Sequence, residues 1–188
     1  AAGEDPAQMH SKIAPTAYRP ELLQLDGNDM PRYVAEAPLF SRFITEITVG
    51  RRDLMLWIQT YLGYGITGHA NEQLLAIFTG GGSNGKGTLL HLVGRVVGDY
   101  YQSAPPSLIV DDGKGGSGPT PEIARLAGIR LLEIEETKDG DKLHESRVKW
   151  LTGEDTLVAR HLHREYFEFT PQFSPILVTN SLPRVSTG

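Results

Sequence analysis

A glycine-rich segment ending in a lysine is the part of the sequence best suited to chemistry. Residues 80–88 read Gly-Gly-Gly-Ser-Asn-Gly-Lys-Gly-Thr, between an apolar run and a stretch with helical periodicity. Glycines let successive backbone N–H groups curl around a phosphate, and the lysine neutralises its charge. The segment predicts a phosphate-binding loop for ATP rather than a simple turn. The predicted nucleotide-binding residues are Gly80, Gly82, Ser83, Asn84, Gly85, Lys86, Gly87 and Thr88.

One position departs from the generic pattern of such loops. Ser or Thr usually follows the lysine and binds Mg²⁺, but this chain has Gly87 there and Thr88 one place later. Either Thr88 takes over a phosphate or metal contact, or Mg²⁺ is held by water, nucleotide and an acidic strand. The sequence leaves both alternatives open, and Thr88 is kept as a candidate metal ligand.

Two adjacent carboxylates follow an apolar strand later in the chain. Residues 130–136 read Arg-Leu-Leu-Glu-Ile-Glu-Glu. In phosphoryl transfer one carboxylate anchors Mg²⁺ and another orients and deprotonates the attacking water. We expect Glu135 to bind the metal and Glu136 to act on the water, although alone the pair would simply begin a charged loop over residues 137–142.

An asparagine after the last apolar strand completes the predicted catalytic set. Residues 176–179 read Ile-Leu-Val-Thr and lead into Asn180. An amide at the end of a strand can hold the attacking water or report the state of the γ-phosphate, although an isolated Asn there is usually a turn residue. The predicted catalytic residues are therefore Lys86, Glu135, Glu136 and Asn180.

An α/β arrangement is expected to position these groups. A buried parallel strand over residues 74–78, the glycine loop and a helix over 89–97 occur in the order that phosphate binding requires. A helix from Thr120 and a strand over 129–134 are expected next. The alternation in residues 158–169 predicts a hairpin. Residues 102–119 are rich in Gly, Pro and Ser and are expected to form a mobile loop.

Two amphipathic helices are expected ahead of this unit. Apolar residues recur at helical spacing over 38–47 and again from Asp53, with stops at Gly50 and then at Gly63 and Gly65. They are expected to form a small N-terminal helical bundle over residues 38–70, followed by an ATPase core over 71–188. Residues 1–37 lack periodicity and are expected to be a linker or arm.

Composition excludes several classes of protein. None of the 188 residues is a cysteine, which excludes disulfides and thiolate zinc sites. The sequence has no apolar run of about 18 residues and no signal-peptide pattern, so we expect a cytoplasmic protein without a membrane partner. The net charge of −5 argues against a surface coated in positive charge for nucleic acid, so any such contact must be local.

Taken together, the motifs resemble those of the superfamily 3 helicases, most closely the phage, plasmid and poxvirus primase-helicase group. The segments that carry the resemblance are LGYGITG, GGGSNGKGTLL, RLAGIRLLEIEET, VKWLTGEDTLVARHLHREYFEFTP and ILVTNSLP. Asn84 in the loop and the block over 149–155 are more specific than a bare phosphate loop. The resemblance implies a P-loop NTPase of AAA+-like fold, with ATP and Mg²⁺ at the interfaces of a hexameric ring around single-stranded DNA.

The same resemblance implies a hairpin within residues 149–169 that reaches into the ring. Its candidate phosphate contacts are Lys149, Arg160, His161, His163 and Arg164, which would bind DNA independently of sequence. Other roles stay open for these side chains. The histidines, expected on one strand face, could pack or form a chance metal pair, and Lys149 and Arg160 could pair with Glu154 or Asp155.

The family's arginine finger lies downstream of the sensor asparagine, and Arg184 comes too early to be a good candidate for it. The chain is therefore expected to be a C-terminally incomplete fragment of a longer protein that includes a primase region. The predicted function is the ATP-driven motor of a DNA helicase. The alternatives are a P-loop phosphotransferase acting on a small molecule and an ATP-gated DNA-binding or loader module.

Overall fold

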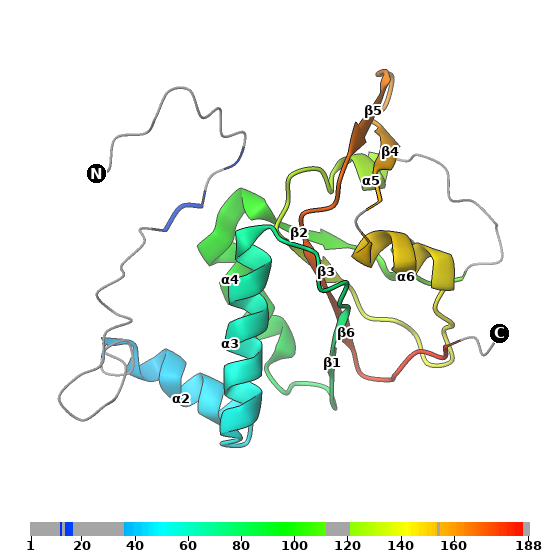
Figure 1. The fold of residues 1–188 in the computed structure, drawn as a ribbon. Coiled ribbons are helices and arrows are strands. Elements are labelled where there is room, and N and C mark those ends of the chain that lie inside the picture. The colour runs from blue at the N-terminus through cyan, green and yellow to red at the C-terminus, as the bar shows by residue number, and fades with distance from the viewer. Residues whose placement is uncertain (1–11, 13, 17–35, 112–120, 154, 186–188) are drawn as a thin grey trace, which may run out of the picture.

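A parallel sheet of four short strands lies at the centre of the structure, with helices on both faces (Figure 1). The structure is a computed structural model that describes residues 12, 14–16, 36–111, 121–153 and 155–185. The strands of this sheet are β1 Ala76–Thr79, β2 Tyr101–Ala104, β3 Leu131–Ile134 and β6 Ser174–Thr179, in the order β1-β6-β3-β2. The expected α/β class, with a parallel sheet flanked by helices, is confirmed.

Side chains on the two central strands alternate between two apolar layers. Ile176 on β6 packs with Tyr61 and Leu90 on the side of helices α3 (Arg52–Thr67) and α4 (Lys86–Val97). Leu177, the next residue, belongs to the cluster on the opposite side, where α6 (Glu145–Thr152) contributes Leu151. Successive residues of a strand point to opposite faces, so a strand covered on both faces is apolar throughout.

Helix α3 continues through the two glycines that were expected to stop it. It ends at Thr67 and is capped by Gly68, whose φ is 78°. The reason is a close contact with the sheet, because a Cβ on Gly65 would lie 2.4 Å from Leu131 Cδ2 and 3.2 Å from Ser174 Cβ. Gly65 therefore allows α3 to pack closely on the sheet and does not end the helix.

A buried tyrosine adds a polar contact between α3 and the sheet. The hydroxyl of Tyr61 donates a hydrogen bond of 2.7 Å to the carbonyl oxygen of Pro175 at the start of β6. Burial raises the pKa of Tyr61 to about 12. The contact fixes the position of α3 on the strand that leads to Asn180.

The first expected helix is confirmed as α2, Pro38–Ile47. It is followed by Val49 and Gly50, which both have positive φ. None of its residues is buried, and Leu39 is 83% exposed. The division into an N-terminal bundle over 38–70 and a core over 71–188 stays a prediction, and most of the expected arm over 1–37 lies outside the described residues. No helix among the described residues is long and apolar enough to cross a membrane.

Part of the segment expected to be a mobile loop is ordered. Residues 101–104 form strand β2, which pairs in parallel with β3, and the short helix η3 (Pro106–Leu108) leads to the fully buried Ile109. Pairing with β3 satisfies the backbone of a stretch whose polar composition alone indicated a loop. Residues 112–120, including Thr120, lie outside the described part of the chain, and α5 begins at Pro121 and ends at Ala124.

The boundaries of three other elements differ from those expected. Strand β1 begins at Ala76, two residues later than the expected start at residue 74. It lies at the edge of the sheet, and its Ile77 is 39% exposed. Strand β3 begins at Leu131, whereas a strand from 129 was expected. Helix α4 begins at Lys86 itself and not at Leu89, so the lysine and the two residues after it occupy its first turn.

The expected hairpin is confirmed as strands β4 (Leu157–Arg160) and β5 (Tyr166–Phe169), which pair antiparallel. Figure 1 shows the hairpin projecting beyond the end of the sheet at which strand β6 begins. Its base is anchored by Leu157 and Ala159, which pack with Ile123 and Ala124 of α5. The tip is thus held away from the core by a small apolar cluster of its own.

Two glycines of α3 provide a matched test of this packing. Gly65→Ala is expected to lower the free energy of unfolding by about 1–3 kcal/mol, because the added methyl overlaps the buried Leu131 side chain. Gly63→Ala is the control, since a Cβ there meets no atom within 4 Å, and it is expected to stabilise the helix by about 0.5–1 kcal/mol. Equal effects of the two variants in urea unfolding would contradict this account of α3.

Candidate functional site

The glycine loop connects the end of β1 to the start of α4. Gly85 immediately precedes the helix with a φ of 87°, and its carbonyl oxygen accepts a hydrogen bond of 2.9 Å from the N–H of Leu89. A Cβ on Gly85 would lie 2.5 Å from Ile47 Cγ2 of α2. Both the backbone conformation and this contact require glycine there. Of the predicted nucleotide-binding residues, Gly80 to Gly85 form the loop, and Lys86, Gly87 and Thr88 open α4.

The ammonium group of Lys86 is surrounded by three acceptors. Its Nζ donates to the carbonyl oxygen of Gly80 at 2.8 Å, to Asn84 Oδ1 at 2.9 Å and to Asn180 Oδ1 at 3.1 Å. An ammonium has three N–H donors, so these contacts use all of them. The half-buried lysine therefore ties the glycine loop to the end of β6.

Asn180 extends this chain of contacts to the acidic strand. Its Nδ2 donates a hydrogen bond of 2.5 Å to Glu136 Oε1, while its Oδ1 accepts from Lys86. The strand order explains the meeting, since β6 lies between β1 and β3 and parallel strands end at the same edge of a sheet. The fold thus brings Asn180 into contact with Lys86, which is 94 positions away along the chain, and with Glu136, which is 44 positions away.

Glu135 contacts a different strand from Glu136. Its Oε1 accepts a hydrogen bond of 2.9 Å from the hydroxyl of Ser103 on β2. Two residues earlier, Glu133 accepts a hydrogen bond from the hydroxyl of Tyr101, also on β2. Burial, together with this carboxylate, raises the pKa of Tyr101 above its usual range. The two adjacent carboxylates are therefore positioned separately, Glu135 by β2 and Glu136 by β6.

A buried pair of threonines links the segments that carry Glu136 and Asn180. Thr137 Oγ1 and Thr179 Oγ1 lie 2.9 Å apart, and the two residues are 3% and 0% exposed. Thr179 also donates to the carbonyl oxygen of Ser181 at 2.7 Å. This pair was not predicted from the sequence, although each threonine adjoins a predicted catalytic residue, which is a signal that could have identified it.

Few side chains at this site could bind Mg²⁺. Among the residues that the structure describes, no three His, Cys, Asp or Glu side chains are arranged to hold a metal ion by themselves. Mg²⁺ commonly keeps several waters and binds through one or two carboxylates and nucleotide phosphates. Glu135, held by Ser103, fits such a partial set, and the exposed Thr88 lies in the first turn of α4. The metal role of either residue stays a prediction.

The hairpin gathers four of the five predicted DNA contacts. Arg160, His161, His163 and Arg164 are all exposed on β4 or in its turn. The Arg160 guanidinium lies 4.9 Å from the centre of the Tyr166 ring, and the His161 ring stacks on Phe167 at 5.3 Å. The expectation that both histidines lie on one strand face is wrong, because β4 ends at Arg160 and His163 adopts a φ of 59° in the turn.

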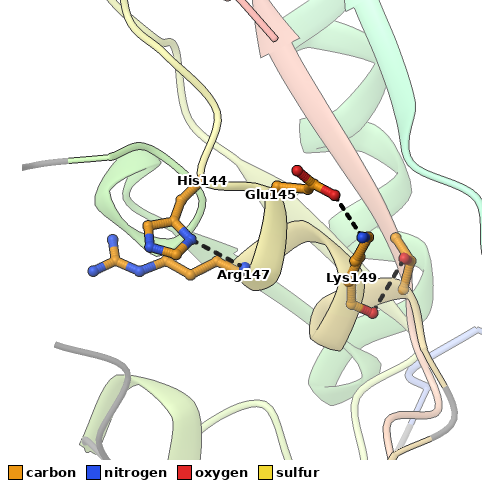
Figure 2. A network of polar contacts seen from close by, with 5 residues as sticks. His144, Glu145, Arg147 and Lys149 are labelled. Carbon is orange, nitrogen blue, oxygen red and sulfur yellow. Dashed lines mark hydrogen bonds and ion pairs between the residues drawn. The ribbon is translucent and has the colours of Figure 1, made fainter. Parts of the chain in front are cut away.

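Lys149 lies apart from the hairpin, on helix α6. Figure 2 shows its ammonium paired with Glu145 one turn earlier, at 2.5 Å. In the same helix the backbone N–H of Arg147 is capped by the ring of His144. The alternative partners considered for Lys149 were Glu154, which lies outside the described residues, and Asp155; the ion pair observed is with Glu145. Lys149 is therefore on a different element from the other predicted DNA contacts and is ion-paired within its own helix.

The threonine pair supports a prediction about site stability. Thr137→Val and Thr179→Val are each expected to lower the free energy of unfolding by about 1–3 kcal/mol, because a buried hydroxyl loses its partner. The double variant should lose less than the sum, since the shared bond is counted once. Thr45→Val, at an exposed position on α2, is the control and should change stability by less than about 0.5 kcal/mol. Strictly additive losses would show that the two hydroxyls are not coupled.

The chain is similar in sequence to proteins of large DNA viruses. It is 34% identical over 131 residues to "Putative helicase L207/L206" of Acanthamoeba polyphaga mimivirus, which covers 70% of this chain and 14% of that protein. It is 32% identical over 129 residues to "Putative primase C962R" of African swine fever virus, covering 68% and 13%. It is 26% identical over 118 residues to "Putative helicase 022R" of Frog virus 3, covering 61% and 12%. No model of a protein family matches the chain.

Solved structures share the fold at much lower identity. An apo structure of the NrS-1 C-terminal region superposes with a TM-score of 0.58 at 15% identity, covering 94% of this chain and 42% of that one. A second apo structure of this region, the A form, gives 0.58 at 14% identity, covering 79% and 34%. The chain spans 14% or less of the viral relatives named above. The comparisons confirm the resemblance found in the motifs at the level that they reach: the chain is homologous to proteins of large DNA viruses that are named as helicases and primases, and it shares the fold of the NrS-1 C-terminal region.

Proposed function

We propose that this chain is the ATP-hydrolysing motor segment of a DNA helicase that acts together with a primase in viral or phage-type replication. The observation that carries the proposal is the meeting of Lys86, Asn180 and Glu136 at the carboxyl edge of the parallel sheet. A cation, an amide and a carboxylate in contact at the end of a glycine loop are the groups that phosphoryl transfer to water requires. This arrangement supports a P-loop NTPase of the AAA+-like kind.

Nucleotide binding follows from the contacts of the loop. The backbone N–H groups of residues 80–88 and the positive end of the 12-residue helix α4 would surround the β- and γ-phosphates. Phosphate oxygens would replace one or more of the three oxygens that Lys86 contacts. Gly80 and Asn84 belong to the loop that precedes Lys86, whereas Asn180 comes from the end of β6, so we infer that Asn180 Oδ1 is the acceptor that a phosphate oxygen replaces.

Hydrolysis would be carried out by the two groups next to Lys86. Glu136 would accept a proton from the attacking water, and the amide of Asn180 would hold the carboxylate in place. Glu135 would face Mg²⁺ through water. When bound, this ion supplies charge stabilisation to the phosphates.

Single-stranded DNA is the proposed polymer on which the motor acts. The hairpin offers exposed cationic groups beside aromatic rings, a combination suited to backbone and base contacts without sequence preference. A ring of six copies around the DNA, a primase region in the same polypeptide and a cytoplasmic location belong to this proposal. The viral relatives named as helicase and primase support it.

The nucleotide site is tested by three substitutions. Lys86→Ala should weaken binding of a fluorescent ATP analogue by about 10- to 100-fold, because the phosphates lose a charged donor. Lys138→Ala, at an exposed lysine after β3, is the control and should bind normally. Glu136→Gln should bind normally yet hydrolyse ATP at least about 100-fold more slowly in single-turnover assays. Normal turnover by Glu136→Gln would refute its assignment as the base.

The DNA assignment is tested by the salt dependence of oligonucleotide binding. Arg160→Ala and Arg164→Ala should each weaken binding to oligo(dT) and reduce the slope of log K against log salt by about 0.7. Arg42→Ala removes an exposed, ion-paired arginine from α2 and should change neither quantity.

ATP turnover with and without the oligonucleotide separates the competing functions. Stimulation that is lost in the hairpin variants supports the helicase motor. DNA binding without stimulation or strand separation supports a loader module. ATP turnover without DNA binding supports a phosphotransferase that acts on a small molecule.

A further inference from the structure

The position after Lys86 opens onto a hollow. Gly87 has no side chain, and a Cβ built on it would meet no atom within 4 Å. It lines a hollow of about 470 Å³ between α4, β2 and β3, together with Tyr101, Ser103 and Glu133 on the strand side and His91, Gly94 and Arg95 on the helix side. This is the position at which the generic loop carries the hydroxyl that binds Mg²⁺. The volume exceeds that of a single water many times over.

Strand β2 directs two hydroxyls toward the acidic strand on the same side as this hollow. In the sheet register Ser103 is opposite Glu133, and side chains two residues apart share a face. Ser103 Oγ donates to Glu135 Oε1 at 2.9 Å, and the hydroxyl of Tyr101 donates to Glu133. Ser103 thus both lines the hollow and holds the carboxylate predicted to face the metal.

We propose that Ser103 is the positioning residue for Mg²⁺ in this chain and replaces, from β2, the hydroxyl that Gly87 lacks. The inference rests on the proposed ATPase function. With one oxygen of Glu135 held by Ser103, the other is left to accept a hydrogen bond from a metal-bound water. A serine hydroxyl that donates to a carboxylate still has lone pairs, so it can accept from a second water in the hollow. Partners that orient a metal-facing ligand typically contribute a factor of about 10–100 to metal affinity.

The test measures how nucleotide affinity depends on Mg²⁺, independently of hydrolysis. A fluorescent non-hydrolysable ATP analogue is titrated in EDTA and then at increasing Mg²⁺ concentration. For Ser103→Ala the Mg²⁺ concentration at half effect should rise about tenfold, while affinity in EDTA stays unchanged. Ser103→Thr, which keeps the hydroxyl, should restore the wild-type value. Ser107→Ala, at an exposed serine on η3, is the control for serine loss.

A rescue variant tests the link to Gly87. Because the space around Gly87 is open, Gly87→Ser places a hydroxyl where the generic loop has one. Combined with Ser103→Ala, it should bring the Mg²⁺ requirement back to within about twofold of the wild type. A double variant that still needs the Mg²⁺ level of Ser103→Ala would overturn the claim that the two hydroxyls are equivalent.

Three outcomes would overturn the proposal, and each identifies the part of it that is wrong. If Ser103→Ala keeps the wild-type Mg²⁺ dependence, Ser103 has no positioning role. If Thr88→Val alone shifts that dependence, the hydroxyl comes from α4. If the unsubstituted protein binds no nucleotide at all, the proposed ATPase function fails first and this inference fails with it.

Discussion

The structure of the candidate site depends on the hydrogen bonds of one ammonium group. Lys86 is half-buried at the first turn of α4, and its donors reach a backbone carbonyl of the loop, an amide of the loop and the amide at the end of β6. A charge in such a position is tolerated only when its donors are satisfied. Hydrogen bonds to a charged group contribute about 1.5–3 kcal/mol each. A phosphate oxygen bound at Lys86 would replace one of these acceptors, so the free energy of phosphate binding would be the difference between two sets of contacts.

The order of the strands determines which groups Lys86 can reach. Because β6 lies between β1 and β3, its last residues adjoin both the glycine loop and the acidic strand. The threonine pair at 2.9 Å joins the segment that follows β3 to the last residue of β6. Glu135 and Glu136 are neighbours in sequence but contact opposite neighbours in the sheet, β2 and β6. Adjacent carboxylates can therefore take separate roles without competing for one partner.

Features with local causes were predictable from the sequence. The loop conformation follows from its glycines, α2 from its apolar spacing, and the hairpin from its alternation. Features that depend on distant contacts were not. Gly65 has the composition of a helix stop, but its role is set by Leu131 and Ser174 far along the chain. The composition around Ser103 predicted a flexible loop. The residue is ordered by the pairing of β2 with β3 and by its hydrogen bond to Glu135, 32 positions away, and neither contact can be predicted from the local sequence.

The most direct test is a crystal structure of the chain with Mg²⁺ and a non-hydrolysable ATP analogue. The account predicts that a β- or γ-phosphate oxygen lies about 3 Å from Lys86 Nζ in place of Asn180 Oδ1, with loop N–H groups directed at the phosphates. Asn180 should then remain in contact with Glu136. A nucleotide bound elsewhere, or a Lys86 that keeps all three protein acceptors with the analogue in place, would contradict the assignment of this loop as the ATP site.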